Sequence, residues 1–219
     1  MARRPARSAK DYRRGKPERA PRELVLIVCE GEKTEKNYLR SLCNDLKLSG
    51  ASVTITPSHR GSDPVSVVTY AIERHKADHS IYARVYCVFD RDTHANFADA
   101  VAIVGSSALS RKGVLHTALS VPCFEYWVLL HFTRSSAPFV ASGGRSPCDN
   151  VVETIKQQPN IADYKKSMED LYARLKPHTD RALANADHIE AQNLHSDSKN
   201  PSTDVHKLVR FLQDLAKKG

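Results

Sequence analysis

Acidic residues directly follow two apolar runs of the chain. Glu30 comes after "LVLIVC" (residues 24–29), and Asp90 and Asp92 come after "VYCVF" (residues 85–89). Crowded carboxylates raise one another's pKa unless a cation offsets their charge, and such hard oxygen ligands suit Mg²⁺ or Mn²⁺. The sequence therefore predicts a metal site built from Glu30, Asp90 and Asp92, and phosphoryl transfer is the chemistry that such sites most often serve.

Each of these signals also has an ordinary structural interpretation. An Asp-x-Asp after a strand often caps a helix or forms a turn, and Glu30-Gly31 is compatible with a plain strand exit in which glycine supplies an unusual backbone angle. The two signals together favour the metal site.

Glu125 is a further candidate catalytic residue. It lies in "CFEYWVLLHF" (residues 123–132), a segment otherwise too apolar for a casual charge. It either points from a helix start into the acidic group or caps that helix's positive end.

Several other polar residues have weaker claims to a role in the site. His94 follows the Asp-x-Asp loop, but it and His131 fit a structural role better than a catalytic one. Lys33 fits a solvated lysine better than a phosphate contact, and Asn200 and Ser202 fit helix caps.

Alternating strand and helix patterns position the acidic residues. Strands are predicted at residues 23–29, 52–57, 83–89 and 113–121, with helices at 33–48, 63–79 and 93–109. This order is typical of an α/β fold with a mostly parallel four-stranded sheet flanked by helices, whose functional side chains collect at the carboxyl ends of the strands. Helices are then predicted at residues 124–132, 148–158, 164–176, 178–194 and 202–218.

Charge and composition divide the chain further. Residues 1–22 carry nine Lys or Arg against two Asp or Glu, so this tail accounts for nearly all of the net charge of +8. Such an arm is predicted to be disordered, and it serves either solubility or attraction to nucleic acid. We expect an α/β core at residues 23–135 and, packed on it, a helical extension at 136–219.

Cysteine spacing and hydropathy bear on the compartment. None of the five cysteines forms a CxxC pair, which favours reduced core thiols over disulfides or a zinc site. No signal peptide or membrane-spanning stretch is evident, so a cytoplasmic protein is expected.

The motifs "LIVCEGEKTEKNY" and "VFDRDTH" resemble the Toprim domain of topoisomerases, primases and OLD-type nucleases. With "PCFEYWVLLHF" and "NPST" added, the chain over about residues 23 to 213 resembles the RloB-like (AbiLii-type) family of prokaryotic anti-phage systems. This resemblance implies a Toprim-like fold, with Glu30 as metal ligand or general acid/base and Asp90 and Asp92 as principal Mg²⁺ ligands. Many OLD-type enzymes have a second acid four positions after the first; here that position is threonine, so Glu35 and then Glu32 are the nearest candidates.

The same resemblance implies a nuclease effector of an abortive-infection system, acting on DNA or RNA, tRNA included. It also implies a separate ATPase partner, since this chain has no GxxxxGK[ST] P-loop.

Two rival functions remain open at the level of sequence. One is a non-catalytic nucleic-acid-binding or scaffold module whose acidic loops only cap helices. The other is a haloacid-dehalogenase-like phosphatase with Asp90 as nucleophile, although the threonine of that motif comes one residue early, at Thr93.

Overall fold

A computed structural model of the chain describes residues 23–31, 33–48, 52–59, 61, 63–91, 94–196 and 199–218. The basic tail, Glu32, Asp92 and Thr93 lie outside these residues. No helix within the described part is long and apolar enough to cross a membrane.

A mixed sheet forms the centre of the fold, as the alternating pattern predicts. Its strands are β1 (Val25–Cys29), β2 (Val53–Pro57), β3 (Arg84–Asp90), β4 (Leu115–Val121) and β5 (Ser202–Thr203), in the spatial order β2-β1-β3-β4-β5. The first four strands are mutually parallel, and β5 runs antiparallel to β4. Central β1 is buried at all five positions, which explains its unbroken apolar run.

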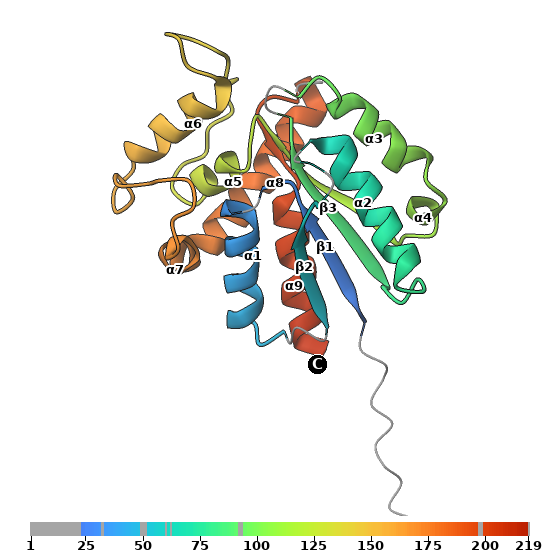
Figure 1. Cartoon of the computed structure of the whole chain (residues 1–219). Coiled ribbons are helices and arrows are strands. Elements are labelled where there is room, and N and C mark those ends of the chain that lie inside the picture. Colours follow the sequence, from blue (N-terminus) through green and yellow to red (C-terminus); the bar gives the residue numbers. More distant parts are fainter. Residues whose placement is uncertain are drawn as a thin grey trace, which may run out of the picture.

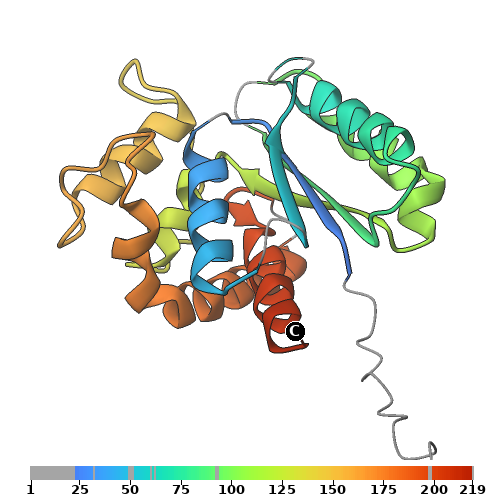
Figure 2. The ribbon, with the colours of Figure 1, turned by 60° about the horizontal axis from the view of Figure 1, so that its bottom comes forward.

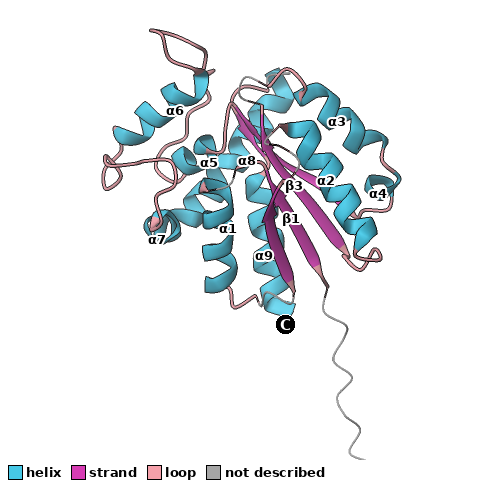
Figure 3. Ribbon diagram, in the orientation of Figure 1, coloured by secondary structure: helices cyan, strands magenta, loops and turns pink. Residues whose placement is uncertain are grey.

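Helices cover both faces of this sheet (Figures 1 and 2). One face carries α2 (Pro64–Ala77), α3 (Phe97–Ser106) and the short α4 (Ala108–Arg111). The other carries α1 (Thr34–Asp45), α5 (Glu125–Leu130), α6 (Pro147–Lys156), α7 (Leu171–Leu175), α8 (Thr179–Ser196) and α9 (Val205–Lys218), with a 3₁₀ turn at Lys176–His178. Figure 3 shows the sheet enclosed between these two helical layers.

The second helical layer joins the two halves of the chain in one hydrophobic core. Alternate residues of β1, such as Val25 and Ile27, pack with Tyr38 of α1 and with Leu208 and Leu212 of α9. The residues beyond position 135 therefore complete the cover of one sheet face.

The structure corrects two element predictions. Residues 202–203 form a fifth strand rather than the start of the last helix, because the backbone N–H of Asp204 donates to Leu119 O at 2.7 Å and ties this segment to β4. In the predicted helix 164–176 only Leu171–Leu175 is α-helical; Ser167 has a φ of 76°, which a helix does not allow.

Asn200 and Ser202 do not act as the predicted helix caps. The Asn200 side chain accepts a hydrogen bond from Phe139 N at 3.2 Å and donates one to Phe139 O at 2.8 Å. The Ser202 hydroxyl donates to Lys199 O at 3.1 Å. Both residues instead hold the loops beside β5.

Candidate functional site

Glu30 and Asp90 meet at the carboxyl edge of the sheet. The parallel register sets Cys29 of β1 beside Val88 of β3, so the residues that follow emerge together. The Asp90 backbone N–H donates to Glu30 Oε2 at 2.9 Å. Asp90 Oδ2 in turn accepts a hydrogen bond from Phe124 N at 3.0 Å, which fixes the carboxylate against the loop after β4.

Glu35 and Glu125 extend this pair to four carboxylates, here called the acidic cluster. Burial raises the pKa of Asp90 well above its usual range, and the charges of Glu35, Glu125 and Glu30 raise it further. Burial likewise raises the pKa of Glu35 to about 7, with Glu125 and Glu30 adding to the shift and Lys166 opposing it. The cluster is therefore short of positive charge.

Gly31 makes room for Glu35. A Cβ built on Gly31 would overlap the Glu35 carboxylate, the nearest atom being Oε2. A side chain at position 31 would therefore displace the Glu35 carboxylate from its place. Glu35 joins the cluster although it lies one position later than the second acid of many OLD-type enzymes.

Glu125 points into the acidic cluster rather than serving only as a helix cap. Its side chain is nearly inaccessible, and Oε1 accepts a hydrogen bond from the Tyr164 hydroxyl at 3.2 Å. Lys166 Nζ lies 3.9 Å from the same oxygen. Two residues of the loop between α6 and α7 thus hold this carboxylate.

Tyr164 and Lys166 are residues that sequence reasoning missed. Their loop is anchored on α1, because Ser167 N donates to Thr34 Oγ1 at 3.1 Å across a separation of 133 residues. No local pattern in "YKKSMED" marks this contact, which depends on the complete fold. The only signal in the sequence was Glu125 itself, a buried acid in need of partners.

Of the other candidate residues, His94 lies beside the acidic cluster, whereas His131 and Lys33 are not assigned to it. His94 Nε2 lies 2.6 Å from Glu30 Oε1, so His94 belongs to the site's surroundings. His131 is fully buried and donates from Nδ1 to Trp127 O at 2.9 Å, and burial lowers its pKa to about 4. It is a neutral structural histidine. Lys33 is exposed immediately before α1.

The cysteine prediction is wrong for one pair. Cys123, after β4, and Cys148, in the first turn of α6, form a disulfide with their Cα atoms 5.8 Å apart. Their separation of 25 positions hides this proximity in the sequence. Cys29, Cys43 and Cys87 are free and buried, as expected.

The disulfide lies against the acidic cluster, because Cys148 Sγ is 3.3 Å from Glu125 Oε2. Within the described residues, Cys123, Glu125 and Cys148 are the only three potential ligands whose donor atoms all lie within 4.8 Å of one another. Both sulfurs are used by the disulfide, so this set offers an ion only the Glu125 carboxylate.

The donor chemistry of the acidic cluster fits a hard divalent cation. Asp90 Oδ1 has no hydrogen-bond partner in the described part of the chain, whereas Oδ2 is held by Phe124. The four carboxylates are more widely spaced than a closed cage. This spacing suits Mg²⁺, which keeps several waters and binds through one or two carboxylates. Glu30, Glu35, Asp90 and Glu125 could hold such an ion.

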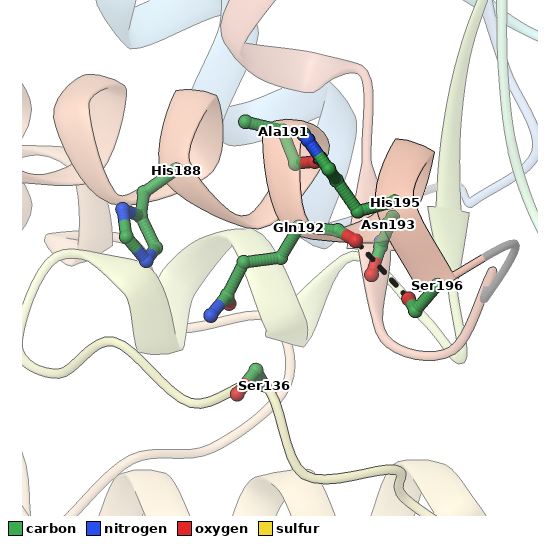
Figure 4. A pocket seen from close by; sticks show the side chains of 7 residues that line it. All are labelled: Ser136, His188, Ala191, Gln192, Asn193, His195 and Ser196. Carbon is green, nitrogen blue, oxygen red and sulfur yellow. Dashed lines mark hydrogen bonds between the residues drawn. The ribbon is translucent and has the colours of Figure 1, made fainter.

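The acidic cluster does not line the cavity at the end of α8. That cavity, of about 460 Å³, is bordered by Ser136 and by polar side chains of α8 that include His188, Gln192 and His195 (Figure 4). No carboxylate faces it, and His195 Nδ1 is already bonded to Ala191 O at 2.7 Å. The acidic cluster is therefore the better candidate for chemistry.

Comparisons with known proteins bear on the family alone. Searches of curated proteins and of solved structures gave no match. A family model described as RloB-like protein matches residues 25–212, a span that contains the whole acidic cluster. The chain belongs to the RloB-like family.

Proposed function

We propose that the chain is a metal-dependent nuclease that cleaves phosphodiester bonds with Mg²⁺ or Mn²⁺. The observation that carries the proposal is the partly buried Asp90 carboxylate, whose pKa burial and the charges of three other acids raise and whose second oxygen has no hydrogen-bond partner among the described residues. Crowded carboxylates destabilise the folded state, so their presence indicates a functional site. A divalent cation bound among them would relieve the repulsion directly.

The residues divide into ligands and positioning groups. Asp90, the last residue of β3, and Glu30, which follows β1, are the proposed ligands among the described residues, and the sequence adds Asp92 to them. Glu35 and Glu125 complete the negative field. A bound divalent ion would supply charge stabilisation to a phosphodiester transition state.

Lys166 and His94 are the cationic or proton-carrying neighbours of the cluster. Lys166 Nζ, more than half exposed, lies over Glu125 at the rim of the site, where a phosphate oxygen of a substrate can approach it. His94 contacts Glu30 and orients that carboxylate. The basic tail adds non-specific, salt-dependent attraction to a polyanion.

The biological setting is proposed on family membership. Resemblance to anti-phage systems supports an effector role in abortive infection together with a partner ATPase. DNA, tRNA and other RNAs remain candidate substrates, and a cytoplasmic location is part of the proposal.

The proposal is tested by Mn²⁺ calorimetry and nuclease assays on Asp90→Asn. This variant should lose specific Mn²⁺ binding and divalent-dependent cleavage of single-stranded or duplex nucleic acids. Asp214→Asn is the matched control, because Asp214 is exposed on α9 and pairs only with Lys217 at 2.9 Å.

Two outcomes would decide against a nuclease. If the wild-type chain binds Mn²⁺ no better than Asp90→Asn, the acidic residues are structural and the scaffold alternative holds. A phosphoaspartate trapped at Asp90 would instead support the phosphatase alternative.

A further inference from the structure

A second cavity, lined by none of the four acidic-cluster residues, lies between α3 and α8 beside the ends of β4 and β5. It has a volume of about 560 Å³ and is bordered by α3, the ends of β4 and β5, and the C-terminal half of α8. This size is within the range of small-molecule sites. The cavity is not used in the chemistry proposed above.

The cavity has apolar walls and carries an aromatic ring. Phe97 of α3 and Leu119 and Val121 of β4 line it, and the Phe97 ring is held edge-on by Phe89 with centroids 5.8 Å apart. Two of its lining residues, Val101 and Leu194, are large apolar side chains exposed at 38% and 81%. The apolar lining is thus open to solvent on both α3 and α8.

Two cations in this cavity lack a partner. Arg91, half-buried, and Lys199 make no side-chain hydrogen bond or ion pair with any described residue. The acidic lining residues Glu190 and Asp204 both pair with Lys207, at 2.6 and 2.7 Å. Arg91 and Lys199 are therefore available to an external anion.

The end of β3 connects the cavity to the acidic cluster. Successive residues of a strand face opposite sides of a sheet. Asp90 bonds toward Phe124 and Glu30, and the next residue, Arg91, lines the cavity. A nucleic-acid strand that crosses this edge of the sheet would contact both the acidic cluster and the cavity.

We propose that the cavity binds one nucleotide unit of a nucleic-acid strand, with its phosphate on Arg91 and Lys199 and its base against Phe97 and the apolar wall. Stacking on an aromatic side chain and phosphate contacts by cations are the two elements of single-strand recognition. The inference rests on the proposed nuclease function, since it makes the cavity a subsite for the strand that the acidic cluster cleaves.

The test measures fluorescence anisotropy of labelled oligothymidylate and oligouridylate, each of about a dozen nucleotides, in EDTA so that no cleavage occurs. Lys199→Glu and Val101→Glu alter exposed cavity residues that are not part of the proposed catalytic machinery. Each should weaken binding about tenfold, through one lost phosphate contact or one blocked stacking wall.

Two substitutions of the same kind serve as controls elsewhere on the surface. Lys112→Glu changes an exposed lysine at the amino-terminal edge of the sheet, and Val140→Glu changes a valine that is 60% exposed in the loop before α6. Both should bind the oligonucleotides as the wild type does. The basic tail is present in every variant, so its contribution cancels.

Equal binding by the cavity variants and their controls would overturn the proposal. Cavity-dependent binding of thymidylate or uridylate monophosphate, with no competition from the oligonucleotides, would also overturn it, because the site would then serve a free nucleotide. Failure of the nuclease function is read separately: Mn²⁺ calorimetry and cleavage report on Asp90, and Lys199→Glu should leave Mn²⁺ affinity unchanged.

Discussion

Glu35→Gln should make the metal-free protein more stable at pH 8. The substitution keeps the shape of the side chain and removes a charge that the fold disfavours. The pKa of Glu35 is raised from 4.5 to about 7, first by burial and then by Glu125 and Glu30. This shift corresponds to about 3 kcal/mol of unfavourable free energy for the ionised form.

The expected gain is somewhat smaller than this figure. Glu35 is only partly buried, so water screens part of the repulsion, and we expect about 2 kcal/mol. The folded protein binds more protons than the unfolded chain between pH 4.5 and about 7, so wild-type stability falls as pH rises through this window. The advantage of Glu35→Gln should therefore be absent below pH 4.5 and complete above pH 7.

Urea unfolding in EDTA at a series of pH values measures this difference directly. A gain of about 2 kcal/mol should move the midpoint by about 1 M urea. Glu169→Gln is the matched control, because Glu169 is exposed and outside the acidic cluster. Added Mn²⁺ should reduce the advantage, since an ion that binds only the folded wild type stabilises it.

The reasoning would be refuted if Glu35→Gln were no more stable than wild type at pH 8. A gain of equal size at pH 4.5 and pH 8 would also refute it, because the stabilisation would then not come from the charge. A small gain in Glu169→Gln would not affect this conclusion, since only the pH-dependent part belongs to the acidic cluster.

Three further substitutions test other contacts of the site and core. Tyr164→Phe removes the hydroxyl that donates to the buried Glu125 carboxylate, so the free energy of unfolding in urea at pH 7.5 should fall by about 2 kcal/mol. His131→Phe removes a histidine whose pKa is lowered from 6.5 to about 4 in the folded protein. As pH falls from 7 to 4.5, the free energy of unfolding of the wild type should therefore fall by up to about 3 kcal/mol relative to this variant. Urea unfolding at both pH values measures this difference. Gly31→Ala places a Cβ where the Glu35 carboxylate lies, and calorimetry should give it the same reduced Mn²⁺ affinity as Glu35→Gln.

The elements that depend on local pattern were predictable from the sequence. The apolar runs of β1 and β3 identify strands buried on both faces. Asp63, the first residue of the predicted helix 63–79, caps α2 by accepting hydrogen bonds from Val65 N at 3.1 Å and Ser66 N at 3.2 Å. Parallel strands then require Glu30 and Asp90 to share an edge. The core of the candidate site follows from these facts alone.

Features that depend on distant contacts were not predictable. The loop with Tyr164 and Lys166 has the polar and apolar spacing of a helix, but its hydrogen bond to Thr34 replaces helical geometry at Ser167. The two-residue β5 is too short to leave a pattern, and it exists because β4 has a free edge. The Cys123–Cys148 pair likewise depends on where α6 docks.

The loop that carries Tyr164 and Lys166 also sets when the site becomes complete during synthesis. A ribosome makes Glu30, Glu35, Asp90 and Glu125 first, and the residues that hold Glu125 emerge some forty positions later. A chain interrupted before residue 164 would contain all four acids of the cluster but neither the hydroxyl nor the ammonium group beside them. The finished arrangement is thus confined to chains that are translated beyond residue 166.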